Sequence, residues 1–185
     1  MIAEIPRTSL YDAVVIGAGP AGSSAAHQLA KAGWRVALVE KEVLGRSRVC
    51  GGFMGPEALF FFKQMGLEEA LAGIGAEPVE ELLLSAPQAR PVHAPLSSSN
   101  TENTAWAFDR ARFDRYLAEK AREAGADLLF RTRTVRLEKR HGVYALDLED
   151  EEKKFRLYAE KVIDATGRRQ PARAPEECFF ALKTV

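Results

Sequence analysis

The sequence predicts an α/β fold with a mostly parallel sheet and a β-meander crossover. The apolar residues 14–16 run into Gly17-Ala18-Gly19-Pro20-Ala21-Gly22, and the next segment has helical periodicity. Residues 34–39 then read as a buried strand, so a strand–helix–strand unit opens the chain. Further along, segments 134–139, 143–148 and 153–158 alternate apolar and polar residues, which predicts a three-stranded meander.

The glycines of the first turn predict a dinucleotide site in a Rossmann-like unit. Gly17 lets the turn leave the strand, Gly19 lets backbone approach a ligand, and Gly22 lets the helix lie close to the strand. The helix, predicted over 20–32, points its free amides and the positive end of its dipole at the turn. Glu40 follows about 20 residues beyond the glycines, where a carboxylate accepts hydrogen bonds from ribose hydroxyls.

Composition and charge predict one soluble domain, at most with a fragment of another. Of the 185 residues 46% are hydrophobic and 28% are charged, and the 26 basic residues balance the 26 acidic ones. Nothing therefore indicates nucleic acid or an anionic membrane. The first ten residues are not a secretory signal, and no apolar stretch reaches spanning length.

The cysteines and histidines indicate neither a disulfide framework nor a metal site. Cys50 and Cys178 are far apart, which fits a reducing cytoplasm, so we expect a cytoplasmic protein. His27, His93 and His141 are isolated and are interpreted as lying on a helix face, in a loop and in a turn. No metal ligand and no catalytic residue is identified.

Turn and capping residues predict the other elements. Gly66 ends a helix over 56–65, in which Leu59-Phe60-Phe61-Phe62 is interpreted as core packing. Asp109 is a good N-cap for a helix over 110–124. The remaining expectations are a short helix over 67–72, extended pieces at 79–85 and 90–93, parallel strands at 127–130 and 161–164, a second glycine turn at 165–167 on the ligand side, and a solvated or phosphate-neighbouring basic run at 131–133.

Three motifs together resemble one branch of the flavoprotein oxidoreductases. They are Pro20 inside the glycine motif, Arg110-Ala111-Arg112-Phe113-Asp114, and Cys50-Gly51-Gly52. With them the chain resembles the geranylgeranyl-reductase-like branch, from about Tyr11 to the C-terminus. That branch shares a superfamily with the hydroxybenzoate-hydroxylase-type FAD monooxygenases and the flavin halogenases.

The resemblance implies FAD as the cofactor and assigns residues to its parts. Gly17, Gly19, Pro20, Ala21 and Gly22 form the pyrophosphate turn, and Glu40 holds the adenosine ribose. Along the rest of FAD it implies Lys41 and Arg48 beside adenosine and phosphates, Cys50, Gly51 and Gly52 on the ribityl and flavin side, Arg110 at the pyrophosphate or ribityl chain, Val135 at the adenine through its backbone, and Gly167 in the second glycine turn.

The same resemblance implies a division of the chain. The expected parts are a first segment of the FAD-binding domain (1–76), an excursion toward a substrate-facing sheet (77–108), a second segment of the FAD-binding domain (109–170) and the start of a truncated substrate domain (171–185). Two departures from the family pattern stand out. Thr166-Gly167 replaces the usual Asp-Gly, with the aspartate two positions earlier at Asp164, and the sequence ends at Val185 where relatives continue.

The function implied is the FAD-binding portion of a flavin-dependent oxidoreductase, either a reductase of an alkene-type substrate or a monooxygenase-like enzyme. NAD(P)H is the expected electron donor and an apolar small molecule the expected substrate. Residues 178–185 read as a strand with apolar residues on both faces, which predicts self-association or a partner chain there. Two alternatives stay open: an NAD(P)-dependent Rossmann dehydrogenase, and a non-catalytic flavoprotein fragment.

Overall fold

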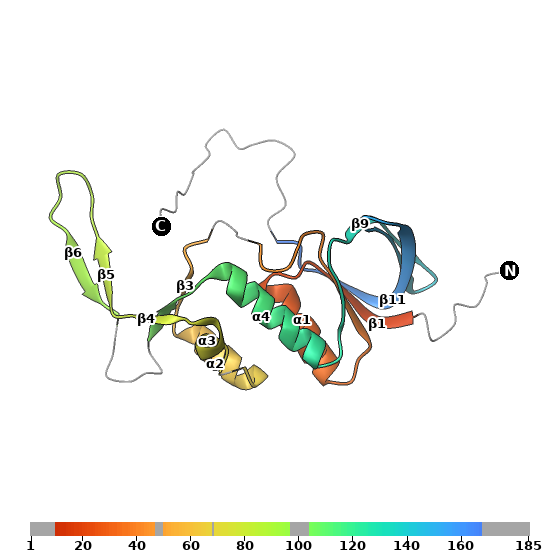
Figure 1. Cartoon of the computed structure of the whole chain (residues 1–185), viewed down its shortest axis with the longest axis horizontal. Helices are drawn as coiled ribbons and strands as arrows, with labels where there is room; N and C mark the ends of the chain where they lie inside the picture. Colours follow the sequence, from red (N-terminus) through yellow and green to blue (C-terminus); the bar gives the residue numbers. More distant parts are fainter. Residues whose placement is uncertain (1–9, 47–49, 68, 97–103, 168–185) are drawn as a thin grey trace. The chain divides into compact units, whose positions relative to one another are not determined.

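The computed structural model describes residues 10–46, 50–67, 69–96 and 104–167 (Figure 1). The predicted site residue Arg48 and the predicted strand over 178–185 lie outside the described residues. The chain divides into two compact units. Of the described residues, one unit holds those up to Arg46 and from Leu117 on, and the other holds those between.

The first unit is built on a six-stranded sheet, as the α/β prediction requires. Three of its strand pairs are parallel and the two meander pairs are antiparallel. In spatial order the strands are β8 (Asp127–Leu129), β2 (Val36–Val39), β1 (Leu10–Ile16), β11 (Lys154–Asp164), β10 (Val143–Glu149) and β9 (Arg133–Arg140).

One expectation about this sheet is wrong in detail. The segments 153–158 and 161–164, predicted as separate strands, form the single strand β11. Its first half pairs with β10 and its second half pairs with β1, with Tyr158 and Ala159 paired on both sides. No glycine or proline separates the two segments, so the strand passes unbroken from the meander into the parallel sheet.

The parallel strands end at one edge of the sheet. Ile16 is in register with Val39 and with Asp164, and Val39 is in register with Leu129. The carboxyl ends of the four strands are therefore level. In open α/β sheets ligands bind beyond the carboxyl ends of the strands, so we expect a binding site at this edge.

Helices cover one face of the sheet and the meander covers the other. On the helical side, Val15 and Leu38 pack with Ala26 of α1 (Pro20–Lys31) and Ala118 of α4 (Arg110–Glu123). On the opposite side, Val14 and Val39 share a buried cluster with Leu146 and Leu148 of β10. The meander strands curve, as Figure 1 shows, and this curvature brings β10 over the face of β1 and β2. The predicted α/β fold with a mostly parallel sheet and a β-meander is confirmed.

One helix cap and one hairpin turn follow the sequence. Asp109 Oδ1 accepts the amide hydrogen of Arg112 at 2.8 Å, so it caps α4 as predicted. His141 and Gly142, both with positive φ, make the two-residue turn between β9 and β10.

The second unit contains two helices, α2 (Glu57–Met65) and α3 (Ala70–Ile74), and two small antiparallel sheets. One sheet has the order β3 (Phe53–Met54), β7 (Ala105–Ala107) and β4 (Glu77–Val79), and the other pairs β5 (Glu81–Leu84) with β6 (Val92–Pro95). The short helix predicted over 67–72 begins later, at Ala70, and ends at the left-handed Gly75. His93 lies in β6 rather than in a loop.

The interpretation of the aromatic run as core is wrong for two of its residues. Phe60 and Phe61 are each 59% exposed, whereas Phe62 is buried and its ring meets Phe113 edge to face with centroids 5.7 Å apart. Consecutive residues on a helix point in different directions, so three adjacent phenylalanines cannot all face one core.

Candidate functional site

Two glycines of the first turn are required by packing within the protein. Gly17 has φ of +104°, and a Cβ there would lie 2.5 Å from the carbonyl oxygen of Ala165. A Cβ at Gly22 would lie 1.8 Å from the carbonyl oxygen of Gly17. The turn thus packs tightly against the start of α1 and against the end of β11. The second glycine turn, at 165–167, is thereby placed beside the first.

Gly19 is different, because nothing in the fold requires a glycine there. Its φ of −75° and ψ of −177° suit any residue, and an added Cβ would meet no atom of the described residues within 4 Å. Gly19 is the N-cap of α1, a position that serine, aspartate or asparagine would stabilise with a side-chain hydrogen bond. The open space in front of Gly19 faces a helix N-terminus, which favours an anion.

Donors suited to an anion surround this space. Pro20 is the first helical residue and has no amide hydrogen to offer. The amides of Ala21 and Gly22 follow in the first turn, where helix geometry provides no intrahelical acceptor. These groups fit a diphosphate that approaches the backbone closely, as the glycine motif predicts.

Glu40 is tied to the same turn. Only 7% of the residue is exposed, and its Oε2 accepts the amide hydrogen of Ala18 at 2.9 Å. Its Oε1 accepts the amide hydrogen of Glu42 at 3.2 Å. A carboxylate can accept about four hydrogen bonds, so these contacts are compatible with ribose hydroxyls as further donors. The carboxylate also fixes the turn, a role that the sequence did not indicate.

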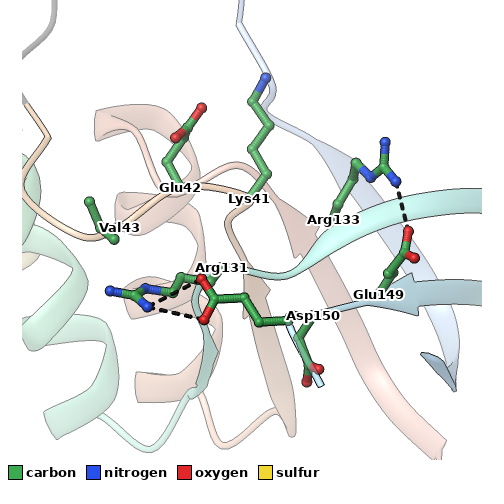
Figure 2. Close-up of a pocket in the computed structure, with 8 residues that line it drawn as sticks. Lys41, Glu42, Val43, Arg131, Arg133, Glu149 and Asp150 are labelled. Carbon is green, nitrogen blue, oxygen red and sulfur yellow. Dashed lines mark hydrogen bonds and ion pairs between the residues drawn. The ribbon is translucent and has the colours of Figure 1, made fainter. Parts of the chain in front are cut away.

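A cavity of about 590 Å³ is lined mainly by charged residues (Figure 2). Lys41, Glu42 and Val43 line it where the chain leaves β2. From the other elements come Arg131, Arg133, Glu149, Asp150 and Glu151. Arg133 pairs with Glu149 at 2.7 Å, and Arg131 pairs with Glu151 at 3.2 Å. Of these residues the resemblance assigned Lys41 to the cofactor, and the sequence left the basic run 131–133 open between a solvated face and a phosphate neighbour.

Val135 lies on the edge strand β9, at an irregularity. Thr134 pairs with Leu148 and Arg136 with Asp147, so the register skips Val135. A bulged residue of this kind is left out of the ladder hydrogen bonds. Its backbone groups are therefore suited to another partner, which is compatible with the predicted contact to adenine.

The last residues of this unit's site differ from the expected Asp-Gly pattern. The amide and hydroxyl of Thr166 both donate to Oδ1 of Asp164, at 3.1 Å and 2.6 Å. Asp164 is thus engaged in the local turn that precedes Gly167. Gly167 itself has φ of +79°.

The second unit holds the other predicted site residues. The guanidinium of Arg110 makes two 3.0 Å hydrogen bonds to Asp114, through Nε and Nη2, so Arg110 is not the solvent-exposed residue that its position in a first helical turn suggests. Burial lowers the pKa of Arg110, but hydrogen bonds to Asp114 and Cys50 outweigh it and raise the pKa overall. The Cys50 sulfur also accepts the amide hydrogen of Gly52 at 3.4 Å.

Comparison with known proteins decides the family. The model of the family described as FAD dependent oxidoreductase matches residues 12–170. The chain belongs to this family. FAD is the cofactor of its members, and the homologous proteins are enzymes. The alternative of an NAD(P)-dependent dehydrogenase is therefore set aside.

Three relatives show how much of the chain is shared. An uncharacterized protein from the nifH2 5′ region of Methanosarcina barkeri is 32% identical over 171 residues, which are 88% of this chain and 85% of that protein. A flavin-dependent halogenase of Armillaria mellea is 35% identical over 126 residues, covering 68% of this chain and 24% of the halogenase. The crystal structure of a geranylgeranyl bacteriochlorophyll reductase-like protein from Thermoplasma acidophilum has a TM-score of 0.73 at 26% identity, covering 86% of this chain and 40% of that one.

This member of the FAD-dependent oxidoreductase family spans most of the first relative and less than half of the other two. The matched region includes both glycine turns and the meander. In the described part of the chain, no helix is long and apolar enough to cross a membrane. The same residues hold no group of three or more His, Cys, Asp or Glu side chains arranged for a metal ion.

Proposed function

We propose that this chain binds the ADP half of FAD at the turn between β1 and α1, as the FAD-binding part of a flavin-dependent oxidoreductase. The observation that carries the proposal is Gly19. It has an ordinary backbone conformation, open space where a side chain would be, and the N-cap position of an uncapped helix. A glycine there gives no side-chain cap, which costs about a few tenths of a kcal/mol against serine or aspartate, and it leaves the space that a diphosphate needs.

Different groups near Gly19 bind the different parts of the ADP half. The first-turn amides of α1 face the diphosphate, and Glu40 accepts from the ribose hydroxyls. Its negative charge also selects against a 2′-phosphate. The charged cavity beside Lys41 and the bulged backbone of Val135 take the adenosine end.

The family resemblance assigns the flavin end of FAD to residues 50–52 and Arg110. Cys50, Gly51 and Gly52 lie along the ribityl chain and flavin in this proposal, and Arg110 binds the ribityl or phosphate region. Bound flavin supplies the redox chemistry, and the protein binds and orients it. We further propose NAD(P)H as the electron donor, an apolar small molecule as the substrate, a cytoplasmic location, and association through residues 178–185.

The test replaces Gly19 with residues that the fold prefers. Gly19→Ser and Gly19→Asp both add an N-cap side chain, so we expect the melting temperature to hold or rise. We expect FAD affinity to fall about tenfold for serine, and further for aspartate, whose charge repels the diphosphate. Gly33→Asn is the matched control at the other end of α1, since asparagine tolerates the left-handed conformation found there.

The measurements are FAD and ADP titrations, the absorption spectrum of the purified protein, and NAD(P)H oxidation with and without added FAD. If the Gly19→Asp protein is folded and binds FAD as tightly as the parent, the site assignment is wrong. If the FAD-loaded parent oxidises neither NADH nor NADPH, the proposed electron donor is wrong. That result would not affect the proposed FAD site.

A further inference from the structure

Asp114 is the most deeply buried charged residue around Arg110. Its side chain is 5% exposed and that of Arg110 is 20% exposed. The two groups meet through Nε and Nη2 of Arg110, which is a bidentate contact of fixed geometry. Phe113, between them in sequence, is buried and stacks edge to face with Phe62 and Phe108. This packing holds the helix face from which Arg110 and Asp114 extend.

The stability of α4 does not account for this pair. Arg110 is the first helical residue after the Asp109 cap, where the positive end of the helix dipole disfavours a cation. A buried ion pair also contributes little compared with apolar residues of similar size, because both charges must leave water. A pair that costs desolvation and opposes the dipole is better explained by what Arg110 contacts.

Arg110 contacts the loop of residues 50–52. Its guanidinium interacts with the Cys50 side chain, an interaction that helps to raise the pKa of Arg110. The sulfur of Cys50 accepts the amide hydrogen of Gly52, and the carbonyl of Gly52 accepts that of Phe108 at 2.7 Å. The loop is thus anchored to α4 by Arg110 and to the residue just before its cap by Gly52. Between the anchors, Gly51 is exposed, and a Cβ there would meet no described atom within 4 Å.

We propose that Asp114 is a positioning residue that fixes the guanidinium of Arg110 against Cys50 and thereby sets the conformation of residues 50–52 for cofactor binding. The inference rests on the proposed function for its consequence, since the loop and Arg110 are assigned there to the flavin end of FAD. The turn amides of α1 and Glu40 take most of the ADP half, and Arg110 can share only the phosphate with them. Asp114 therefore affects FAD more than ADP.

The test compares Asp114→Asn with the parent as the full chain. Asparagine keeps the size of the side chain but presents one acceptor instead of two and removes the charge. We expect FAD affinity to fall about tenfold, because a hydrogen bond to a charged group is lost, and ADP affinity to fall less. Arg110→Lys keeps the positive charge but loses the two-pronged guanidinium that bonds both carboxylate oxygens. It should likewise lower FAD affinity more than ADP affinity.

Two further variants separate positioning from folding. In Arg110→Gln/Asp114→Asn no charge is left buried alone, so this protein should fold even if Asp114→Asn does not. If Asp114 acts only through Arg110, the loss of FAD affinity in the double variant equals that of Arg110→Gln alone. Losses that add, or an unchanged ratio of FAD to ADP affinity in a folded Asp114→Asn protein, would overturn the proposal.

The reactivity of Cys50 tests the role of Asp114 without FAD, and so independently of the proposed function. Positive charge beside a cysteine favours the reactive thiolate, so iodoacetamide labelling of Cys50, followed by mass spectrometry of its peptide, reports the position of Arg110. We expect labelling to slow several-fold in folded Asp114→Asn. If the parent binds no FAD, the proposed function fails, while slower labelling still supports the positioning role. Labelling at the parent rate or faster contradicts it.

Discussion

At the scale of single residues, the glycines of the first turn are required for different reasons. Gly17 and Gly22 have no room for a side chain, because carbonyl oxygens lie 2.5 Å and 1.8 Å from where their Cβ atoms would be. Gly19 has room and an ordinary conformation. The motif therefore combines two positions where the fold requires glycine with one where the fold leaves open space, and substitutions distinguish them.

Glu40 provides a prediction about ribose selection. Its carboxylate lies beside the turn and holds the amides of Ala18 and Glu42. We expect the parent to bind ADP more tightly than 2′-phospho-ADP. In Glu40→Gln, ADP affinity should fall about tenfold because a charged acceptor is lost. The ratio of ADP affinity to 2′-phospho-ADP affinity should also fall, because the charge that repels the 2′-phosphate is gone.

Titration calorimetry with both nucleotides measures this prediction, and Glu160→Gln on the exposed face of β11 is the control. Unfolding in urea should show that Glu40→Gln is also less stable by about 1–3 kcal/mol, since buried amides lose a charged acceptor. An unchanged preference between the two nucleotides would argue that Glu40 serves the turn alone.

At the scale of elements, α4 contributes to a hydrophobic core and also carries a buried ion pair. Ala118 and Ala121 pack under the sheet, while the first turns carry Phe113 in an aromatic cluster and the Arg110–Asp114 pair. The spacing Arg-x-x-Phe-Asp places Arg110 and Asp114 four residues apart, on one face of the helix. The two ends of the motif are therefore joined as a structural ion pair.

The cap of α4 provides the second prediction. Asp109→Ala removes the hydrogen bond to the amide of Arg112, so we expect a loss of about 1 kcal/mol in unfolding free energy. Asp109→Asn keeps the cap and should remain near the parent. Urea unfolding at constant pH measures both variants, and equal stabilities of the alanine and asparagine variants would contradict the role of the cap.

At the scale of the whole molecule, buried titratable groups link stability to pH. His27 is 7% exposed on α1, and its pKa is lowered by burial and by the charges of Lys31 and Lys120, with Glu123 acting in the opposite direction. The unfolded chain, with a pKa of 6.5 for this group, takes up the proton first. His27 therefore leaves the free energy of unfolding unchanged well above pH 6.5. It lowers that free energy as the pH drops from 6.5 toward the folded-state pKa.

We expect urea unfolding to show a loss of stability between about pH 7 and pH 5 that is smaller in His27→Gln. Asp147, Glu149 and Asp150 do not interfere, because their lowered pKa values start from 3.8 or 4.5 and matter only in more acid solution. A His27→Gln protein with the same pH dependence as the parent would show that other groups govern this range.

Much of the fold and part of the site could be predicted because the determinants are local. The glycine turn, the Asp109 cap and the His141-Gly142 turn depend on residues close in sequence, and each is where it was predicted. Phe60 and Phe61 were misread because apolar character alone does not say which residues of a helix face inward.

The sequence by itself determined the order of strand, glycine turn, helix and acid, and with it the family and the cofactor class. Tertiary structure decided which distant residues meet: Ala165 against Gly17, the charged lining of the cavity beside Lys41, and Cys50 against Arg110. Periodicity and caps arise from interactions over a few residues, so sequence records them directly. Contacts between elements depend on how strands pair and how far a sheet curves, and those depend on the packing of the whole chain.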